Sequence, residues 1–394
     1  MADLSKHFYN TISAPCFYEN LEIDKACEDE LINARKIIRD HLREGIKAFS
    51  GTTAGGGKTI TPKFYTQGSW AYKTVNNPCY KPPQQVDYDD GLYLPVSYLE
   101  NVRPSVAAKV YFAVVDDLLK DLCKLRGWNF DGTKKTCSRV IISTTSHVDI
   151  PLYSIPDSEF NTLVEMADRK DKTSIVLDSA YEFSEEVWSQ IASETVLLAL
   201  RDGDWTPSDP RKIHLWFIKE VSEKGEQLRR TCRYLKAWRD NIWNRGGPSS
   251  ILIMTLASEL IVPSHSRDDI ALHSILKRLF GRLETPVFNP ADPSECLSDR
   301  FDSNTKGQFI NSIKGFAEDL LTAMGGDVEI STGCGLIQKH LGDRFPIIKG
   351  TAEQKLESPS WNENQAAVLV PTVQGISYAK VQLKEMNVKP WRSI

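Results

Sequence analysis

The sequence has no long hydrophobic run, which limits where the protein can reside. Its most apolar stretch, residues 251–262, is interrupted by Ser258 and Glu259. It is also shorter than the roughly 20 apolar residues that span a bilayer, so we expect no membrane segment. Near the N-terminus, Asp3 and Lys6 stand where a secretion signal needs an apolar core. We therefore expect a cytoplasmic protein.

Paired cysteines and a strong excess of one charge are also missing. The eight cysteines are scattered without a C-x-x-C pair, which argues against structural zinc and against a disulfide framework. Forty-eight basic and 52 acidic residues leave a net charge of −4. This balance excludes a strongly basic nucleic-acid coat, although not a local basic groove. With 394 residues, the chain is long enough for two globular domains.

The hydrophobic periodicity predicts a mixed α/β half followed by a helical half. Asp24 is placed to cap a helix to about residue 50, along which apolar residues recur at three- and four-residue steps. Strand-like runs follow at residues 63–66, 85–93 and 139–153, with a helix over residues 104–125 before the last. Helical patterns dominate beyond residues 205–210. We take this Pro-containing segment as the boundary between residues 1–205 and residues 206–394.

The loop at residues 51–59 ends in Gly-Lys-Thr and so resembles a phosphate-binding P-loop. Thr52, however, occupies the position of the first glycine in that pattern. The loop also follows a predicted helix, whereas a P-loop follows a strand. We interpret it as a turn without a phosphate-binding role.

Three aspartates carry the strongest signal for chemistry. Asp87 and Asp89 lie two residues apart in a strand-like run, so their side chains share one face of the strand. Asp149 lies in another strand-like run, and the three carboxylates converge if the two strands are neighbours. Converging carboxylates repel one another unless divalent cations neutralise them. Such a group is typical of two-metal phosphoryl or nucleotidyl transfer, with Mg²⁺ or Mn²⁺ as the cations.

A Gly-Ser pair precedes these acids in the chain. Gly68 lets backbone N–H groups approach an anion closely, and Ser69 adds a hydroxyl donor at an expected helix start. A triphosphate bound there would lie beside the cations. A Gly-Ser turn or an Asp-x-Asp pair is common by itself. The ordered set, with a strand aspartate downstream, makes the prediction specific.

Three segments carry a resemblance to a known family: residues 67–74 (QGSWAYKT), 86–93 (VDYDDGLY) and 147–153 (HVDIPLY). Further matches lie at residues 207–214, 233–239 and 248–250. Through these segments most of the chain resembles the bacterial cGAS/DncV-like nucleotidyltransferases (CD-NTases) of the polymerase-β superfamily. The resemblance implies a polymerase-β-like α/β (α+β) lobe with a mixed sheet and a helical C-terminal lobe. The active site would occupy the cleft between them.

The resemblance also assigns roles to residues. It implies that Asp87 and Asp89 bind two Mg²⁺ or Mn²⁺ ions, and that Asp149 completes the site and helps to activate the acceptor hydroxyl. The nucleotide-binding set that we expect is Gln67, Gly68, Ser69, Lys73, Thr74, Ser208, Lys236 and Ser250. Within it, Lys236 and Ser250 match residues that face the donor triphosphate, and Ser208 matches a residue near the acceptor nucleotide.

Three more residues are candidates around this site. Arg139, at the head of the strand that carries Asp149, is a candidate phosphate contact. Asp299 is a candidate match for a family carboxylate that reads a purine edge. His147 shares a face with Asp149, and we expect it to support the metal ligands without being one of them.

As a function, the resemblance implies a synthase that joins ATP and GTP into a cyclic purine dinucleotide, with cyclic GMP-AMP as the expected product and pyrophosphate released. Such enzymes act in bacterial anti-phage (CBASS) signalling, where the product activates an effector. We expect regulatory or conjugating protein partners, but no membrane and no obligatory nucleic acid. The alternatives are a synthase of another cyclic or linear oligonucleotide, and a catalytically silent sensor of nucleotides or nucleic acid. The intact set of three aspartates argues against the sensor.

Overall fold

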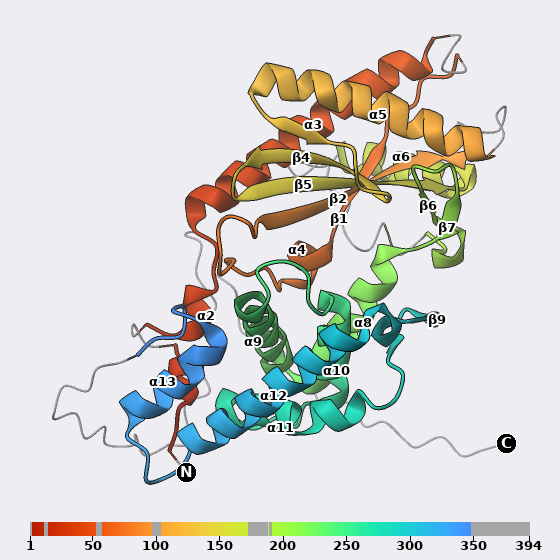
Figure 1. Ribbon diagram of the computed structural model, residues 1–394. Helices are drawn as coiled ribbons and strands as arrows, with labels where there is room; N and C mark the ends of the chain where they lie inside the picture. The colour runs from red at the N-terminus through yellow and green to blue at the C-terminus, as the bar shows by residue number, and fades with distance from the viewer. Residues whose placement is uncertain are drawn as a thin grey trace, which may run out of the picture. The chain divides into compact units, whose positions relative to one another are not determined.

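The computed structural model describes residues 2–11, 15–52, 57–96, 104–171, 188 and 191–347. A mixed sheet dominates its first half and helices dominate its second half (Figure 1). The prediction of an α/β fold with a helical C-terminal part is therefore confirmed. None of the helices in the described ranges has both the length and the apolar character of a membrane span.

The sheet places two long parallel strands at its centre. Its strands run in the order β1 (Lys63–Gln67), β2 (Val86–Pro95), β5 (Ser146–Ile155), β4 (Cys137–Ser143) and β3 (Asn129–Asp131). Two short strands, β6 (Leu197–Ala199) and β7 (Trp205–Pro207), extend it from β5. β2 and β5 are parallel, whereas β1 pairs with β2 and β4 pairs with β5 in antiparallel fashion. This arrangement brings the two aspartate-bearing strands side by side.

The run that we expected as one strand over residues 139–153 is instead a hairpin of β4 and β5. Its turn consists of Thr144 and Thr145 and contains none of the Gly, Pro, Asn or Asp residues that mark a turn in sequence. Arg139 therefore does not stand at the head of the strand of Asp149. It lies directly opposite Asp149 on the neighbouring strand.

Two long helices cover one face of the sheet, α3 (Lys25–Ser50) and α5 (Pro104–Arg126) (Figure 1). Asp24 caps α3 as expected, because its carboxylate accepts a 2.8 Å hydrogen bond from the Cys27 N–H. On this face Asp90 of β2 accepts hydrogen bonds of 2.7 and 2.5 Å from Arg39 of α3. Asp90 thus points away from the face that Asp87 and Asp89 share. Two further helices follow sheet strands along the chain: α4 (Gly68–Tyr72) comes after β1, and α6 (Asp157–Asp171) comes after β5.

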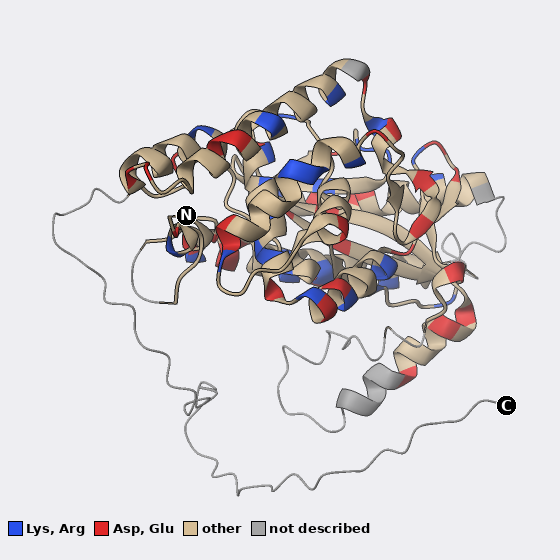
Figure 2. Cartoon of the chain, turned by 90° about the horizontal axis from the view of Figure 1, so that it is seen from below, with Lys and Arg blue, Asp and Glu red and all other residues tan. Residues whose placement is uncertain are grey.

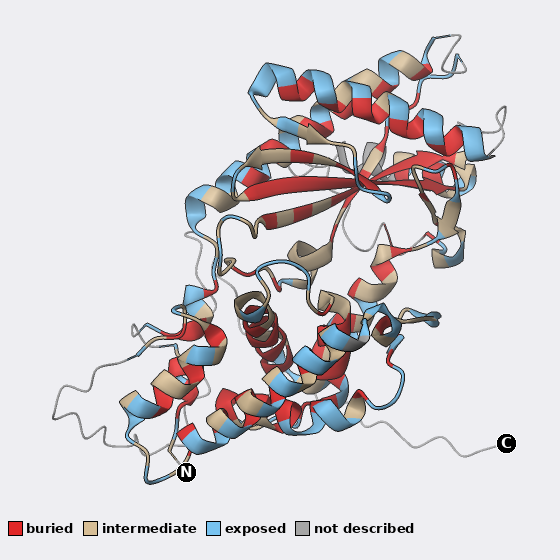
Figure 3. Cartoon of the chain, in the orientation of Figure 1, coloured by how far each residue is buried: buried red, intermediate tan, exposed pale blue. Residues whose placement is uncertain are grey.

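The helical half surrounds α9, which is largely buried (Figure 3). Its helices are α8 (Pro210–Lys224), α9 (Glu226–Ile242), α10 (Ser250–Leu260), α11 (Asp268–Arg282), α12 (Ser303–Ala323) and α13 (Ile330–Leu341), with a hairpin of β8 (Phe288–Asn289) and β9 (Asp292–Cys296). On α9, Leu228, Cys232 and Leu235 are buried, whereas Ile242 at its end is exposed.

The N-terminus also belongs to this second core. Phe8 of α1 (Ser5–Phe8) and Phe17 of α2 (Phe17–Asn20) lie 5.3 and 5.5 Å from the Tyr234 ring of α9, measured between ring centroids. The chain therefore begins in the helical half and then crosses to the sheet. The boundary near residue 205 stays a prediction, and residues 348–394 lie outside the described ranges.

Candidate active site

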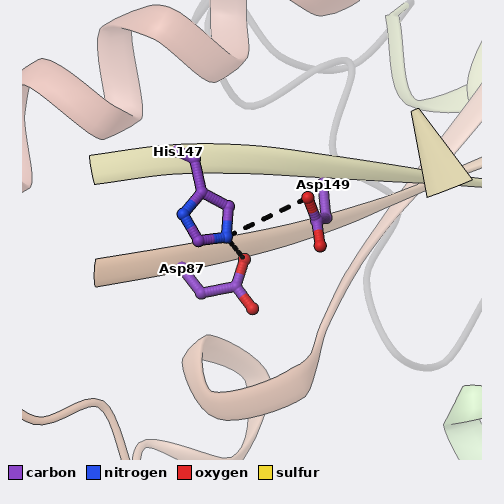
Figure 4. A group of neighbouring side chains, drawn as sticks. All are labelled: Asp87, His147 and Asp149. Carbon is purple, nitrogen blue, oxygen red and sulfur yellow. Dashed lines mark ion pairs between the residues drawn. The ribbon is translucent and has the colours of Figure 1, made fainter. Parts of the chain in front are cut away.

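The parallel pairing of β2 and β5 brings the three predicted acids together. Its register places Asp89 opposite Asp149, and Asp87 opposite His147. Single ligand atoms of Asp87, His147 and Asp149 all lie within 4.8 Å of one another (Figure 4). The convergence that we derived from strand alternation therefore occurs, and it includes a histidine.

The electrostatics of this group favour a bound cation. Burial raises the pKa of Asp89 well above its ordinary value, and the negative charges of Asp87 and Asp149 raise it further. Arg139 and Lys236 offset these effects only in part. An ionised Asp89 is therefore costly in the free protein, and a divalent cation would remove that cost.

Arg139 holds one of the acids in place. Its Nε and Nη2 atoms each donate a 2.6 Å hydrogen bond to a different oxygen of Asp149. This two-point pairing follows from their directly opposed positions on β4 and β5. Arg139 thus contacts a predicted metal ligand in this structure, and its candidate role as a phosphate contact stays a prediction.

A tight turn brings the backbone of Gly68 against Asp89. Gly68 begins α4 directly after β1 and has a φ of +65°, in the left-handed region that favours glycine. A Cβ atom at this position would lie 2.0 Å from Oδ2 of Asp89. Only glycine therefore allows the turn to approach the acid so closely.

Asp87, Asp89 and this turn line one side of a cavity of about 570 Å³. The sheet half contributes Gly68, Ser69, Thr74, Asp87 and Asp89 to its lining. The helical half contributes residues of α9 and α10 and of the chain around β8 and β9, namely Lys236, Arg239, Ser250, Met254, Asn289, Glu295 and Arg300. The cavity is thus lined by both halves of the protein, as the family resemblance implied.

Lys236 lies at the junction of the two halves. Its Nζ donates a 2.6 Å hydrogen bond to the carbonyl oxygen of Thr74, which follows α4. Burial, together with the charge of the nearby Arg239, lowers the pKa of Lys236 to about 8. Within the described ranges, this buried ammonium group has a single hydrogen-bond acceptor, so it is well suited to an incoming anion.

Ser250 begins α10, but it is not the residue that caps this helix. The capping role belongs to Ser249, whose hydroxyl accepts a 3.3 Å hydrogen bond from the Leu252 N–H. The Ser250 hydroxyl instead accepts a 2.9 Å hydrogen bond from Arg239. Ser250 and Arg239 therefore present a hydroxyl and a guanidinium to the cavity together.

The other expected nucleotide contacts are not among the described residues that line this cavity. Gln67 is buried, and its side-chain amide donates a 3.2 Å hydrogen bond to the Tyr153 hydroxyl. Lys73 is exposed where α4 ends, and Asp299 is exposed in the turn before α12. The Ser208 N–H donates a hydrogen bond to the Val196 carbonyl oxygen, beside β6.

The basic side chains of Arg229 and Arg233 on α9 serve mainly to join the two halves. Arg233 donates hydrogen bonds to Asn76 at 2.9 Å and to Glu22 at 2.5 Å. Arg229 pairs with Glu226 and donates to the Tyr72 carbonyl oxygen. Basic and acidic residues are interspersed over the face seen in Figure 2. In the described part of the chain, α9 therefore forms no continuous basic strip for nucleic acid.

Sequence reasoning missed several residues that line the cavity, among them Gln85 and Arg239. Arg239 lies three residues after Lys236 on α9, so helical spacing could have placed the two side by side. Gln85 directly precedes β2 and contacts His147 of β5. Only the pairing of the two strands brings Gln85 and His147 together, and no spacing along the chain indicates it.

The residues present suit a divalent cation. Asp87, Asp89 and Asp149 offer carboxylate oxygens, and His147 offers a ring nitrogen. Oδ1 of Asp87 and Nε2 of His147 are buried and lie 2.9 Å apart, and neither atom has a hydrogen-bond partner among the described residues. Two such orphaned atoms that face the same space, beside further carboxylates, fit the requirements of a metal site.

Family models match both halves of the chain. Residues 62–153 match the nucleotidyltransferase domain of proteins like the cyclic GMP-AMP synthase DncV. Residues 225–349 match the C-terminal domain of cyclic GMP-AMP synthase. All three acids lie within the first match, and Lys236 and Ser250 lie within the second.

Curated relatives and solved structures agree with these matches. Cyclic GMP-AMP synthases of Vibrio cholerae and Escherichia coli are 38% and 37% identical over 60% and 58% of this chain. The chain spans 56% and 53% of their lengths, or about half of each. A solved structure of the V. cholerae di-nucleotide cyclase DncV is 26% identical, with a TM-score of 0.72, and covers 87% of this chain and 97% of its own. Another, of the V. cholerae enzyme in complex with the linear intermediate pppA(3′,5′)pG, is 26% identical with a TM-score of 0.70, and covers 87% of this chain and 96% of its own.

Proposed function

Since the chain belongs to the family of DncV-like nucleotidyltransferases, with both of the family's domains matched, we propose that it is a nucleotidyltransferase that makes a cyclic purine dinucleotide from ATP and GTP. Cyclic GMP-AMP is the product that we expect. The first step would join two nucleotides and release pyrophosphate. The second step, in the same cavity, would close the ring and release a second pyrophosphate.

One observation carries this proposal. Asp87 and Asp89 of β2 line one cavity together with the Gly68 turn, Lys236 and Ser250, and Asp149 of β5 lies opposite Asp89 in the sheet. This arrangement provides an anionic site for cations and, within the same cavity, cationic and hydroxyl groups for a triphosphate. Transfer at an α-phosphorus needs both, since its catalysis depends mainly on positioning and electrostatics.

In the proposed mechanism, the side chains of Ser69, Lys236 and Ser250 hold the donor triphosphate. Lys236 and Arg239 balance its negative charge, and the closed turn at Gly68 keeps Asp89 in position. Asp149, oriented by Arg139, would accept a hydrogen bond from the acceptor hydroxyl. Asp87, Asp89 and Asp149 would hold two Mg²⁺ or Mn²⁺ ions, which stabilise charge on the attacking and leaving oxygens when bound.

We extend the proposal to the biological setting that the family resemblance implies. The protein would act in the bacterial cytoplasm, in anti-phage signalling, and its product would activate a separate effector. Regulatory or conjugating protein partners would then control it. The C-terminal residues 391–394, which would bear on conjugation, lie outside the described residues.

The proposal can be tested by following pyrophosphate release from ATP and GTP in the presence of Mg²⁺ or Mn²⁺. We expect release by the wild-type protein and none by Asp87→Asn, because an amide is a poorer and neutral ligand. Asp202→Asn is a matched control, since Asp202 is an acid on the same half that pairs with Lys135 at the surface. Asp202→Asn should retain wild-type release.

Two results would contradict the proposal. Turnover in Asp87→Asn within a few-fold of wild type would mean that the acids do not form the catalytic site. The second is a wild-type protein that binds nucleotides but releases no pyrophosphate from any pair of them, even with lysate of phage-infected cells added as a source of activator. This result would favour the silent sensor.

A further inference from the structure

Residues 74–85, which we call the connecting segment, join α4 to β2 and contain neither helix nor strand. The segment nevertheless contacts α9 of the helical half at both of its ends. At its start, the Thr74 carbonyl oxygen accepts the hydrogen bond from Lys236. At its end, it reaches the C-terminal end of α9 and then enters β2, the strand that carries Asp87 and Asp89.

Gln84, near the end of the connecting segment, uses both sides of its amide. Its Oε1 atom accepts hydrogen bonds from the backbone N–H groups of Cys79 at 2.9 Å and Tyr80 at 3.0 Å. Its Nε2 atom donates to the carbonyl oxygens of Asp240 at 2.7 Å and Trp243 at 3.0 Å. The reverse orientation would set donors against donors and acceptors against acceptors, so the amide is fixed. Gln84 therefore fastens the connecting segment to the end of α9.

The carbonyl oxygens that it binds are ones that a helix leaves unpaired. α9 ends at Ile242, and the carbonyl groups of the last turn of a helix have no partner within that helix. Gln84 satisfies the carbonyl of Asp240, and the Tyr80 hydroxyl donates a 3.1 Å hydrogen bond to that of Asn241. The connecting segment thus caps α9 from the sheet half of the protein.

This cap lies between the two sets of groups that the proposed function requires. Gln84 precedes Asp87 by three residues along the chain. Asp240 directly follows Arg239 and lies about one helical turn after Lys236. Gln84, Lys236 and Arg239 also line the same cavity. The contact between Gln84 and α9 is therefore placed to set the distance between the acids of β2 and the cationic side chains of α9.

We propose that Gln84 is a positioning residue, which holds Lys236 and Arg239 at the distance from β2 at which they and the acid-bound cations engage one triphosphate together. This inference rests on the proposed function for the identity of the ligand as a nucleoside triphosphate. Two sets of groups that bind one ligand reinforce each other only when their spacing matches it. Gln84 acts through the backbone of α9 and touches no reacting atom in this role.

The test compares two glutamines on the same helix junctions. Gln84→Met keeps the length of the side chain and removes its hydrogen bonds without adding charge. Gln227→Met is the matched control, because Gln227 lies at the opposite end of α9. Its amide accepts a 2.8 Å bond from the Ser264 N–H and donates to the Ser264 carbonyl at 2.9 Å and to Asp268 at 2.8 Å, all within the helical half.

The first measurement involves no turnover. Calorimetric titration gives the affinity of the full chain for an ATP analogue with a methylene group between its α- and β-phosphorus, with and without Mn²⁺. In the wild type and in Gln227→Met, Mn²⁺ should strengthen this affinity, because both sets of groups then hold the same triphosphate. In Gln84→Met the gain from Mn²⁺ should shrink about tenfold, while the affinity without Mn²⁺ stays within a few-fold of wild type.

The second measurement is the rate of pyrophosphate release from ATP and GTP, at a temperature below the Tm of every variant. Gln84→Met should lower kcat about 10- to 100-fold with KM changed only a few-fold, since a displacement of about 1 Å suffices for such a loss. A variant that is only less stable would keep its kcat at this temperature, and we expect this of Gln227→Met. Tyr80→Phe removes the cap of Asn241 alone and serves if Gln84→Met does not fold; it should show the same losses at a few-fold.

Several results would overturn the inference. One is a gain from Mn²⁺ and a kcat in Gln84→Met equal to those of Gln227→Met. Another is an equal loss of affinity with and without Mn²⁺, which would mean that Gln84 contacts the nucleotide itself. A gain from Mn²⁺ that Gln84→Met loses, in a protein that makes no product, would contradict the proposed function alone.

Discussion

Replacing Gly68 by alanine separates the geometry of the active site from the stability of the fold. The new Cβ atom would lie 2.0 Å from Oδ2 of Asp89, and real Cβ atoms essentially never approach a heavy atom within 3.0 Å. The carboxylate must therefore retreat by about 1 Å, and a misplacement of this size can slow an enzyme about 100-fold. A non-glycine residue at the φ of +65° costs a further ~1–2 kcal/mol of stability.

Gly127 offers a matched control. It has a φ of +71°, and an added Cβ would meet nothing within 4 Å. Gly127→Ala carries the same backbone cost without the clash, so it should lower Tm by a few degrees while its rate of pyrophosphate release stays at the wild-type level. The assays are melting curves and initial rates at saturating ATP and GTP. Equal rates for the two variants would refute the argument that the Gly68 turn sets the position of Asp89.

Three further predictions concern charge and phosphate binding. Asp89→Asn should abolish activity and raise Tm at neutral pH without divalent cations. The reason is that ionisation of Asp89 lowers the stability of the folded protein as pH rises from the ordinary pKa of 3.8 through the raised pKa. The gain in Tm should vanish at acidic pH, and a lower Tm at neutral pH would contradict this reasoning. Because the pKa of Lys236 is about 8, the affinity for triphosphate, measured by calorimetric titration, should fall as pH rises above 8. Over the same range, up to pH 10.5, the contribution of Lys236 to protein stability should rise. Lys236→Arg should remove the pH dependence of both the affinity and the stability. Ser250→Ala should slow turnover at low nucleotide concentration about tenfold, whereas Lys58→Ala should have no effect. An equal loss of turnover in the two variants would mean that the phosphate site is not the one proposed.

The parts of this protein that could be predicted from sequence depend on short-range patterns. The Asp24 cap, the apolar stripe of α3 and the shared face of Asp87 and Asp89 all follow from helical or strand periodicity within a few residues. The convergence of Asp149 with them needed one assumption, that the two strands are neighbours. The parallel pairing of β2 and β5 satisfies it.

The parts that could not be predicted depend on pairing between distant segments. The Thr144-Thr145 turn carries no turn signal, so the hairpin was missed, and with it the pairing of Arg139 with Asp149. The contact of Gln85 with His147 arises from the same strand pairing. Likewise, nothing near Phe8 indicates that its ring packs against Tyr234, 226 residues further along the chain.

The most direct test of the proposed function is the chemical nature of its product. The purified protein is incubated with ATP and GTP and with Mg²⁺ or Mn²⁺, treated with phosphatase, and analysed by mass spectrometry; single nucleotides and other pairs are run in parallel. A linear product loses its terminal phosphates to phosphatase, whereas a ring has no terminal phosphate to lose. We predict a phosphatase-resistant product with the mass of a cyclic dinucleotide of AMP and GMP, which is absent with Asp149→Asn. Linear oligonucleotides alone, or no product from any nucleotide pair, would contradict it.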